Sequence, residues 1–175
     1  MLGKFIYIEF HIPIRDYLSI LTWKEAFFDL IIPLIVAIVS YCFIFNCANI
    51  DKLATFTGLV INFLAILIGF SITSLTILSS ESGNSFETLK KYDSKRNIGN
   101  KPITGYQLIL ITFICVILVE FITLAYNLTY YLLWVNGFLT SYVRIIIAIN
   151  IFLMLHIIML NIRNITNFFF IFWKS

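Results

Sequence analysis

Four apolar segments, each long enough to cross a lipid bilayer, constrain the fold of this chain more than any other feature. They cover about residues 26–45, 57–79, 107–132 and 144–162. A helix needs about 20 predominantly apolar residues to span the hydrocarbon layer. The chain is also only 12% charged, whereas a soluble domain carries about 25% charged residues. The sequence therefore predicts an all-α integral membrane protein with four transmembrane helices.

Local signals mark the first of these helices. Thr22 and Glu25 have the spacing of a capping box, in which each side chain accepts a hydrogen bond from the main-chain amide of the other residue. Pro33 lies inside the segment and has no N–H to bond the preceding turn, so we expect a kink there. Residues 1–22 are then an N-terminal cytoplasmic or interfacial segment, and residues 23–175 form the transmembrane domain.

The distribution of basic residues predicts the orientation. With four spans, the N-terminus, the loop at 80–104 and the C-terminus share one side of the membrane, and basic residues gather in cytoplasmic segments. Two of the 12 Lys and Arg residues, Lys52 and Arg144, lie on the other side. The shared side holds the remaining ten: Lys4, Arg15, Lys24, Lys90, Lys91, Lys95, Arg96, Lys101, Arg163 and Lys174. Both termini are therefore predicted to face the cytoplasm.

Little of the chain lies outside the four segments. Phe5 to Ile14 alternates between apolar and polar side chains, which predicts a short strand or an interfacial segment. Within the loop 80–104, Phe86 to Tyr92 is expected to form one or two helical turns. The net charge of +3 is too small to indicate direct binding of nucleic acid. The three cysteines show neither a disulfide nor a metal-ligand spacing, and we expect no cofactor.

The second segment contains many small and polar residues for a membrane helix, in the stretch "VINFLAILIGFSITSLTILSS". Steps of four and three residues place them on one face of a helix. Small residues let helices approach closely within lipid, whereas a face rich in hydroxyl groups can line a water-filled path. The sequence leaves both interpretations open. The members of this small-residue stripe are Gly58, Asn62, Ala65, Gly69, Thr73 and Thr76.

The third segment carries an acidic residue, Glu120, deep in the membrane, where an ionisable group marks a functional site by default. Counting about 1.5 Å per residue from the helix ends places Ser40, Asn62 and Glu120 at similar depth. We expect them to form one hydrogen-bonded layer, either as a structural clasp or as an element that responds to protons or ions. One four-helix unit needs little more than one polar face to hold its helices together, but both the second and the third segment carry one. This excess of polar surface predicts a homo-oligomer.

The fourth segment carries His156, for which we expect a hydrogen bond to another helix, and Arg163, which we expect to reach the lipid phosphates. Ser71 and His156 come out at similar depth, as a serine nucleophile and its base would require. However, Thr73 stands where the motif G-x-S-x-G has its second glycine, and no residue is evident to orient the histidine. We therefore predict that the chain is not an enzyme.

Basic residues of the loop 80–104 lie just outside the membrane. Each basic residue near an acidic lipid surface contributes about 1 kcal/mol to binding. The group can therefore bind lipid headgroups or a soluble cytoplasmic partner, or it serves only to set the topology. It consists of Lys90, Lys91, Lys95 and Arg96.

The four-span layout with both ends inside, the short basic inner loop and the helix "NFLAILIGFSITSLTILSS" resemble the small membrane subunit of the bacterial Kiwa anti-phage defence system. The resemblance covers the whole chain as an arrangement, and Asn62 to Ser80 in detail. It implies a multi-pass homo-oligomer of the bacterial inner membrane that senses phage attack on the envelope and holds a soluble DNA-binding protein at the membrane. It implies no catalytic residues. The alternative is a small oligomeric ion channel or membrane-permeabilising effector whose second helix lines the pore.

Overall fold

A computed structural model describes residues 9, 11–43, 50–80, 84–135 and 143–173 of the chain. The elements, in chain order, are α1 (His11–Ile20), α2 (Trp23–Ala26), η1 (Phe27–Ile31), α3 (Ile32–Phe43), α4 (Ile50–Ser80), α5 (Asn84–Lys91), β1 (Asp93–Ile98), β2 (Lys101–Thr104), α6 (Gly105–Val135) and α7 (Val143–Trp173). η1 is a turn of π-helix, and α2, η1 and α3 follow one another without interruption.

Four of the described helices are long and apolar enough to cross a membrane. They cover Trp23–Phe43, Thr55–Ser80, Gly105–Leu133 and Val143–Asn167. The predicted fold class is confirmed, and the four predicted segments coincide with these helices. A kink was predicted at Pro33. The helix is irregular just before this residue, where the π-helical turn η1 ends two residues before the proline.

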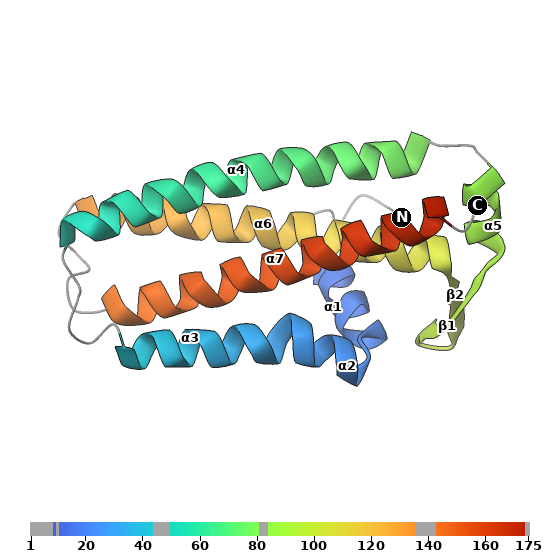
Figure 1. The fold of residues 1–175 in the computed structure, drawn as a ribbon, viewed down its shortest axis with the longest axis horizontal. Helices are drawn as coiled ribbons and strands as arrows, with labels where there is room; N and C mark the ends of the chain where they lie inside the picture. The colour runs from blue at the N-terminus through green and yellow to red at the C-terminus, as the bar shows by residue number, and fades with distance from the viewer. Residues whose placement is uncertain (1–8, 10, 44–49, 81–83, 136–142, 174–175) are drawn as a thin grey trace.

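The four long helices lie side by side in the order α4, α6, α7 and α3 (Figure 1). α6 packs on both α4 and α7, while α3 packs against α7. A core cluster of Val60, Leu64 and Ile157 also joins α4 to α7. The most apolar window of α6 is 39% buried, but that of the first span is only 17% buried. α6 is therefore the centre of the domain, and the first span forms its edge.

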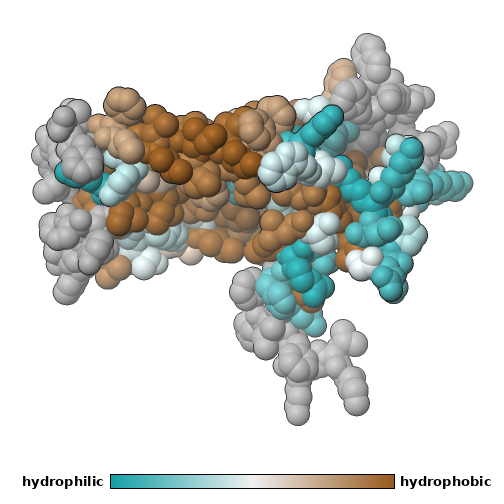
Figure 2. Space-filling view, turned by 90° about the horizontal axis from the view of Figure 1, so that it is seen from below, coloured by the Kyte–Doolittle hydropathy of each residue, from teal (hydrophilic) through white to brown (hydrophobic). Residues whose placement is uncertain are grey.

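The short elements gather at one end of the long helices. α5, β1 and β2 lie there with the last turns of α7, while α3 ends and α4 begins at the opposite end (Figure 1). Figure 2 shows, on the face in view, an apolar band along the long helices and hydrophilic residues at the end that carries the short elements. This arrangement agrees with a loop 80–104 on the same side as the C-terminal part of α7. That this side faces the cytoplasm stays a prediction from the basic residues.

The loop 80–104 is more ordered than the sequence predicts. The expected helical turns are confirmed as α5, but the antiparallel hairpin of β1 and β2 was missed. Gly99 occupies the first central position of its two-residue turn with a φ of 59°. A positive φ favours glycine, which adopts it without strain. The dipeptide Gly99-Asn100 was therefore the sequence signal for the hairpin turn.

The expectation of a strand in the N-terminal segment is wrong for its described part. His11 to Ile14 belongs to α1, and the residues before His11, apart from Glu9, lie outside the described residues. Tyr17 and Ile20 are buried on one face of α1, and Ile14 packs beside Tyr17 against α6. Ile14, Tyr17 and Ile20 are three residues apart and therefore share one face of a helix. This helical pattern is stronger than the short apolar–polar alternation that suggested a strand.

Candidate functional site

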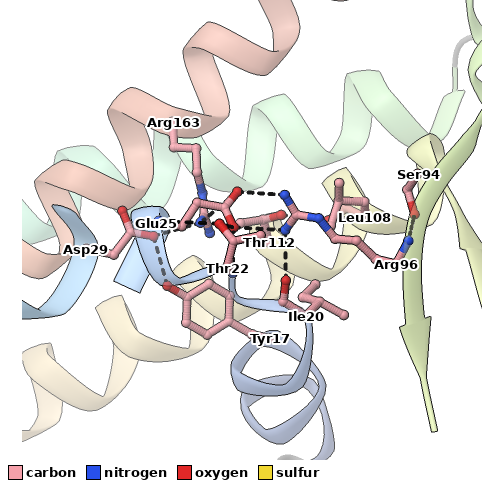
Figure 3. Close-up of polar contacts among 10 residues, drawn as sticks. All are labelled: Tyr17, Ile20, Thr22, Glu25, Asp29, Ser94, Arg96, Leu108, Thr112 and Arg163. Atoms are coloured by element: carbon pink, nitrogen blue, oxygen red, sulfur yellow. Dashed lines mark hydrogen bonds and ion pairs between the residues drawn. The ribbon is translucent and has the colours of Figure 1, made fainter. Parts of the chain in front are cut away.

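An ion-pair network joins the N-terminal part of the chain to the hairpin. The predicted capping box is present, because the Thr22 amide donates to Glu25 Oε2 at 2.9 Å and the Glu25 amide donates to Thr22 Oγ1 at 3.4 Å. The Glu25 carboxylate also accepts a hydrogen bond from each terminal nitrogen of Arg96, on β1, at 2.9 Å (Figure 3). Such bidentate pairs between arginine and carboxylate are among the stronger hydrogen bonds in proteins. Arg96 also donates to the main-chain oxygen of Ile20 at 2.8 Å.

A second arginine extends the network into the membrane domain. Arg163, on α7, lies with Nη1 2.7 Å from Asp29 Oδ2 and 3.7 Å from Glu25 Oε1. Tyr17 donates its hydroxyl to Asp29 Oδ2 at 3.0 Å, and Asp29 is only 3% exposed. Burial raises the pKa of Tyr17 above its ordinary value, so the phenol keeps the proton that it donates. The network thus links α1, the first span, β1 and α7 (Figure 3).

The structure corrects two predictions for these arginines. Arg163 does not reach outward to lipid phosphates, because the buried carboxylate of Asp29 holds it within the protein. Arg96 was expected to bind headgroups or a partner, but it is engaged by Glu25. Neither partner is close in sequence, and spacing alone therefore could not reveal these pairs.

The other predicted basic residues of the loop remain at the surface. Lys90 pairs with Glu87 at 2.8 Å, and both side chains are exposed. This contact raises the pKa of Lys90 and lowers the pKa of Glu87. Lys91 and Lys95 are also exposed. The surface open to a partner therefore carries Lys90, Lys91 and Lys95, without Arg96.

Pro33 and His156 connect the first span to α7. A proline at position 33 cannot donate an N–H to the carbonyl of Asp29, four residues earlier. His156 Nδ1 lies 2.6 Å from this oxygen. A carbonyl oxygen can only accept, so Nδ1 carries the hydrogen. The prediction that His156 bonds another helix is confirmed.

Glu120 lies at the contact of three helices. Its Oε1 accepts from Ser71 Oγ, on α4, at 3.0 Å and from Asn161 Nδ2, on α7, at 2.9 Å. Its side chain is wholly buried, and Oε2 has no hydrogen-bond partner among the described residues. Ser71 and His156, which the sequence placed at similar depth, bond different groups, namely Glu120 and the Asp29 carbonyl.

The prediction that Ser40, Asn62 and Glu120 form one hydrogen-bonded layer is wrong, because Glu120 bonds other residues. Asn62 is exposed on α4, and Ser40 is half-buried on α3, which packs against α7. Asn62 and Ser71 are nine residues apart, which is about two and a half helical turns and therefore opposite faces of α4. The helix ends are also not level, since Ser71 lies nine residues before the end of α4 but Glu120 fifteen residues after the start of α6.

The small-residue stripe of α4 lies on the outside of the single chain. A Cβ atom added at Gly58 or Gly69 would meet nothing within 4 Å. Thr73 and Thr76 donate their hydroxyls to main-chain oxygens of their own helix. Gly58 is half-buried, and the other five members are exposed: Asn62, Ala65, Gly69, Thr73 and Thr76. Apart from the half-buried Gly58, the stripe therefore faces away from the described helices of its own chain, and its role between copies stays a prediction.

The buried asparagines of α7 were not predicted from the sequence. Asn127 Nδ2 donates to Asn150 Oδ1 at 2.7 Å between α6 and α7. Asn164 is 1% exposed, and neither of its amide atoms has a hydrogen-bond partner among the described residues. Asn150 and Asn161 are eleven residues apart, which is about three helical turns and hence one face. This spacing was the signal for a polar seam facing α6.

Comparison of the chain with protein-family models, with curated proteins and with solved structures gives no match.

Proposed function

We propose that this chain is a non-catalytic membrane scaffold that assembles with copies of itself and holds a soluble protein at the cytoplasmic face of a bacterial inner membrane. The observation that carries the proposal is the ion-pair network. Arg96 of the hairpin and Arg163 of α7 both contact Glu25 of the first span. A loop that only connects two spans does not need these ion pairs. A docking surface benefits from them, because a surface that is ordered before binding loses less entropy when the partner binds.

The platform of this proposal consists of α5 and the hairpin. Its exposed basic residues are Lys90, Lys91, Lys95 and, on β2, Lys101, and Tyr92 is 61% exposed. Tyrosine is enriched at protein interfaces, and basic groups favour an acidic partner surface. We infer a soluble protein partner with an acidic docking surface, and no direct contact of this chain with nucleic acid.

The resemblance to the Kiwa membrane subunit supports a role in anti-phage defence. In that role the chain senses a disturbance of the envelope and passes it to a soluble DNA-binding protein. The shared carboxylate of Glu25 offers a mechanical route, since a shift of α7 moves Arg163 and thereby changes the contact that holds Arg96.

Self-assembly is proposed through the small-residue stripe. Asn62 exposes its amide about seven residues, or roughly 10 Å, inside the span that begins at Thr55. A polar amide in lipid favours a hydrogen bond with another helix, and Gly69 permits close approach. A second copy of the chain satisfies both, and lipid covers the remaining apolar surface.

Recruitment to the membrane tests the scaffold. The chain would be expressed with the soluble protein encoded by the neighbouring gene, and the membrane-bound fraction of that protein would be measured. Changing Lys90, Lys91 and Lys95 together to Gln should release it, because the platform loses three of its four exposed positive charges. Changing Arg15 and Lys24 to Gln is the matched control, since these residues are exposed outside the platform. Equal recruitment by the triple variant, or none by the unmodified chain, would refute the proposal.

An oligomeric ion channel is the second candidate, and the exposed position of the stripe supports it. Thr73 and Thr76 on this face would line a water-filled path if several copies turned the stripe toward a common axis. Reconstitution in liposomes separates the two functions. A scaffold should leave the vesicles tight to ions, whereas a channel should release a trapped ion in proportion to the protein added.

A further inference from the structure

The environment of Glu120 poses a charge problem that the scaffold role does not address. The carboxyl group is wholly buried between α4, α6 and α7. An ionised carboxylate in the bilayer interior is strongly unfavourable unless a cation or a proton neutralises it. The question is therefore which group supplies the positive charge.

The described part of the chain brings no cationic side chain to this carboxyl group. On α7, both Arg163 and His156 are directed to Asp29, the first to its side chain and the second to its main chain. The span of α4 from Thr55 to Ser80 contains no titratable residue. From α1, Tyr17 also bonds Asp29.

On α6 itself, the titratable neighbours are uncharged. Cys115, five residues before Glu120, packs in a core cluster with Tyr17 and Val116. Tyr126, six residues after Glu120, is half-buried. Because neither carries a positive charge, the counter-charge for Glu120 must come from outside the described residues.

The groups around Glu120 are arranged as oxygen-rich neighbours of a carboxylate. Asn161 Nδ2 donates to Glu120 Oε1 and also to the Ile157 oxygen at 3.1 Å, which fixes the amide orientation. Asn161 Oδ1 is consequently directed to Ser71 Oγ, at 3.4 Å. The Ser71 hydroxyl has one hydrogen and stands 3.0 Å from Glu120 Oε1. Three helices therefore bring four side-chain oxygens together, and one of them, Glu120 Oε2, is buried without a partner.

We propose that Ser71, Glu120 and Asn161 form an intramembrane binding site for one small monovalent cation, either a proton or a sodium ion. A proton would be held on Oε2, the oxygen left free by the two donors. A sodium ion would be held by the carboxylate together with the oxygens of Ser71 and Asn161. In both cases the cation neutralises Glu120 and stabilises the contact of α4, α6 and α7. The proposal rests on this buried geometry and does not depend on a soluble partner.

Infrared spectroscopy of the protein in liposomes tests the proposal. A protonated carboxyl group has a carbonyl stretching band that the ionised form lacks. All nine Asp and Glu side chains give such a band when protonated, so we expect one component of it to grow as pH falls in the unmodified chain and to be lost in Glu120→Gln. Glu87→Gln is the matched control, because it removes an exposed carboxyl group and should leave the band of the buried group unchanged.

Replacing choline by sodium at constant pH and ionic strength distinguishes the two cations. If sodium abolishes the band and raises the thermal stability of the unmodified chain but not of Glu120→Gln, the site binds sodium. If the band is indifferent to sodium, the site binds a proton. The proposal is overturned if no band depends on Glu120 and sodium stabilises both forms equally.

A second variant keeps the test decisive should Glu120→Gln fail to fold. Ser71→Ala retains the carboxyl group but removes one of its two donors. The carbonyl band, or the effect of sodium, should persist with a shifted midpoint. A midpoint equal to that of the unmodified chain would show that Ser71 is no part of the site and would overturn the proposal.

Discussion

Two acidic side chains are buried among the described residues, Asp29 and Glu120, and their charges are balanced in different ways. Asp29, near the hairpin end, meets Arg163 at 2.7 Å and the hydroxyl of Tyr17. Glu120, in the middle of the helices, meets among the described residues only neutral donors, from Ser71 and Asn161. Both sites join α7 to another helix. The first site is therefore an ion pair within the protein, whereas the second has no cationic partner among the described residues, as the proposed cation site requires.

The largest expected effect comes from breaking the ion pair of Asp29 and Arg163. Arg163→Met leaves Asp29 buried without a counter-charge, which should lower the free energy of unfolding by about 3–5 kcal/mol. Adding Asp29→Asn should recover most of this loss, because no unpaired charge then remains. Thermal unfolding in a mild detergent measures both, with Arg15→Gln as a control at an exposed pair. A double variant as unstable as the single one would contradict the charge argument.

A smaller effect is expected at Glu120, where hydrogen bonds dominate the contribution to stability. Glu120→Leu removes the acceptor that the Ser71 hydroxyl and Asn161 share. Ser71 can still donate to Asn161 Oδ1 and Asn161 still donates to the Ile157 oxygen, so about 1–3 kcal/mol is expected in total. Glu120→Gln keeps an acceptor and should unfold close to the unmodified chain in the absence of added cation. Chemical denaturation of the three forms checks this order. Equal loss in both variants would argue against neutral hydrogen bonding at this site.

The hairpin end should respond more weakly still. Arg96→Gln removes the bidentate contact to Glu25, whose side chain is 24% exposed, so about 1–2 kcal/mol is expected after screening by solvent. The loss should be local, because Arg163 still pairs with Asp29. Hydrogen exchange should therefore accelerate at β1 and β2 and remain slow in α6 and α7. Uniform acceleration would mean that the two arginines act as one unit.

The smallest effect on the single chain is expected at the stripe. Gly69→Leu places its side chain in open space, so the fold of one chain should be unchanged. Assembly should weaken, and Asn62→Leu should weaken it by about 1 kcal/mol through the lost hydrogen bond. Analytical ultracentrifugation in detergent measures the oligomer. The matched control is Ile66→Leu, at an exposed apolar position of the same helix. A monomeric unmodified chain would remove the basis for this prediction.

The sequence by itself determined the features that depend on neighbouring residues. Runs of apolar residues specified four long helices, since each must satisfy its backbone within lipid. The capping box of Thr22 and Glu25 and the helical turns of α5 were predicted for the same reason. Glu120 was also recognised as a buried polar centre, because a single carboxylate in an apolar helix is costly wherever it points.

Only the tertiary structure decided which residues meet. Glu120 and Ser71 are 49 residues apart, and Arg96 and Glu25 are 71 residues apart. Periodicity places a side chain on a face of its helix, but it does not say toward which neighbour that face turns. For α4 the buried face proved to be that of Leu64 and Ser71, opposite the stripe. Rotation and relative height of packed helices follow from the fit of all the helices together, and these two variables set the partners of every buried polar group.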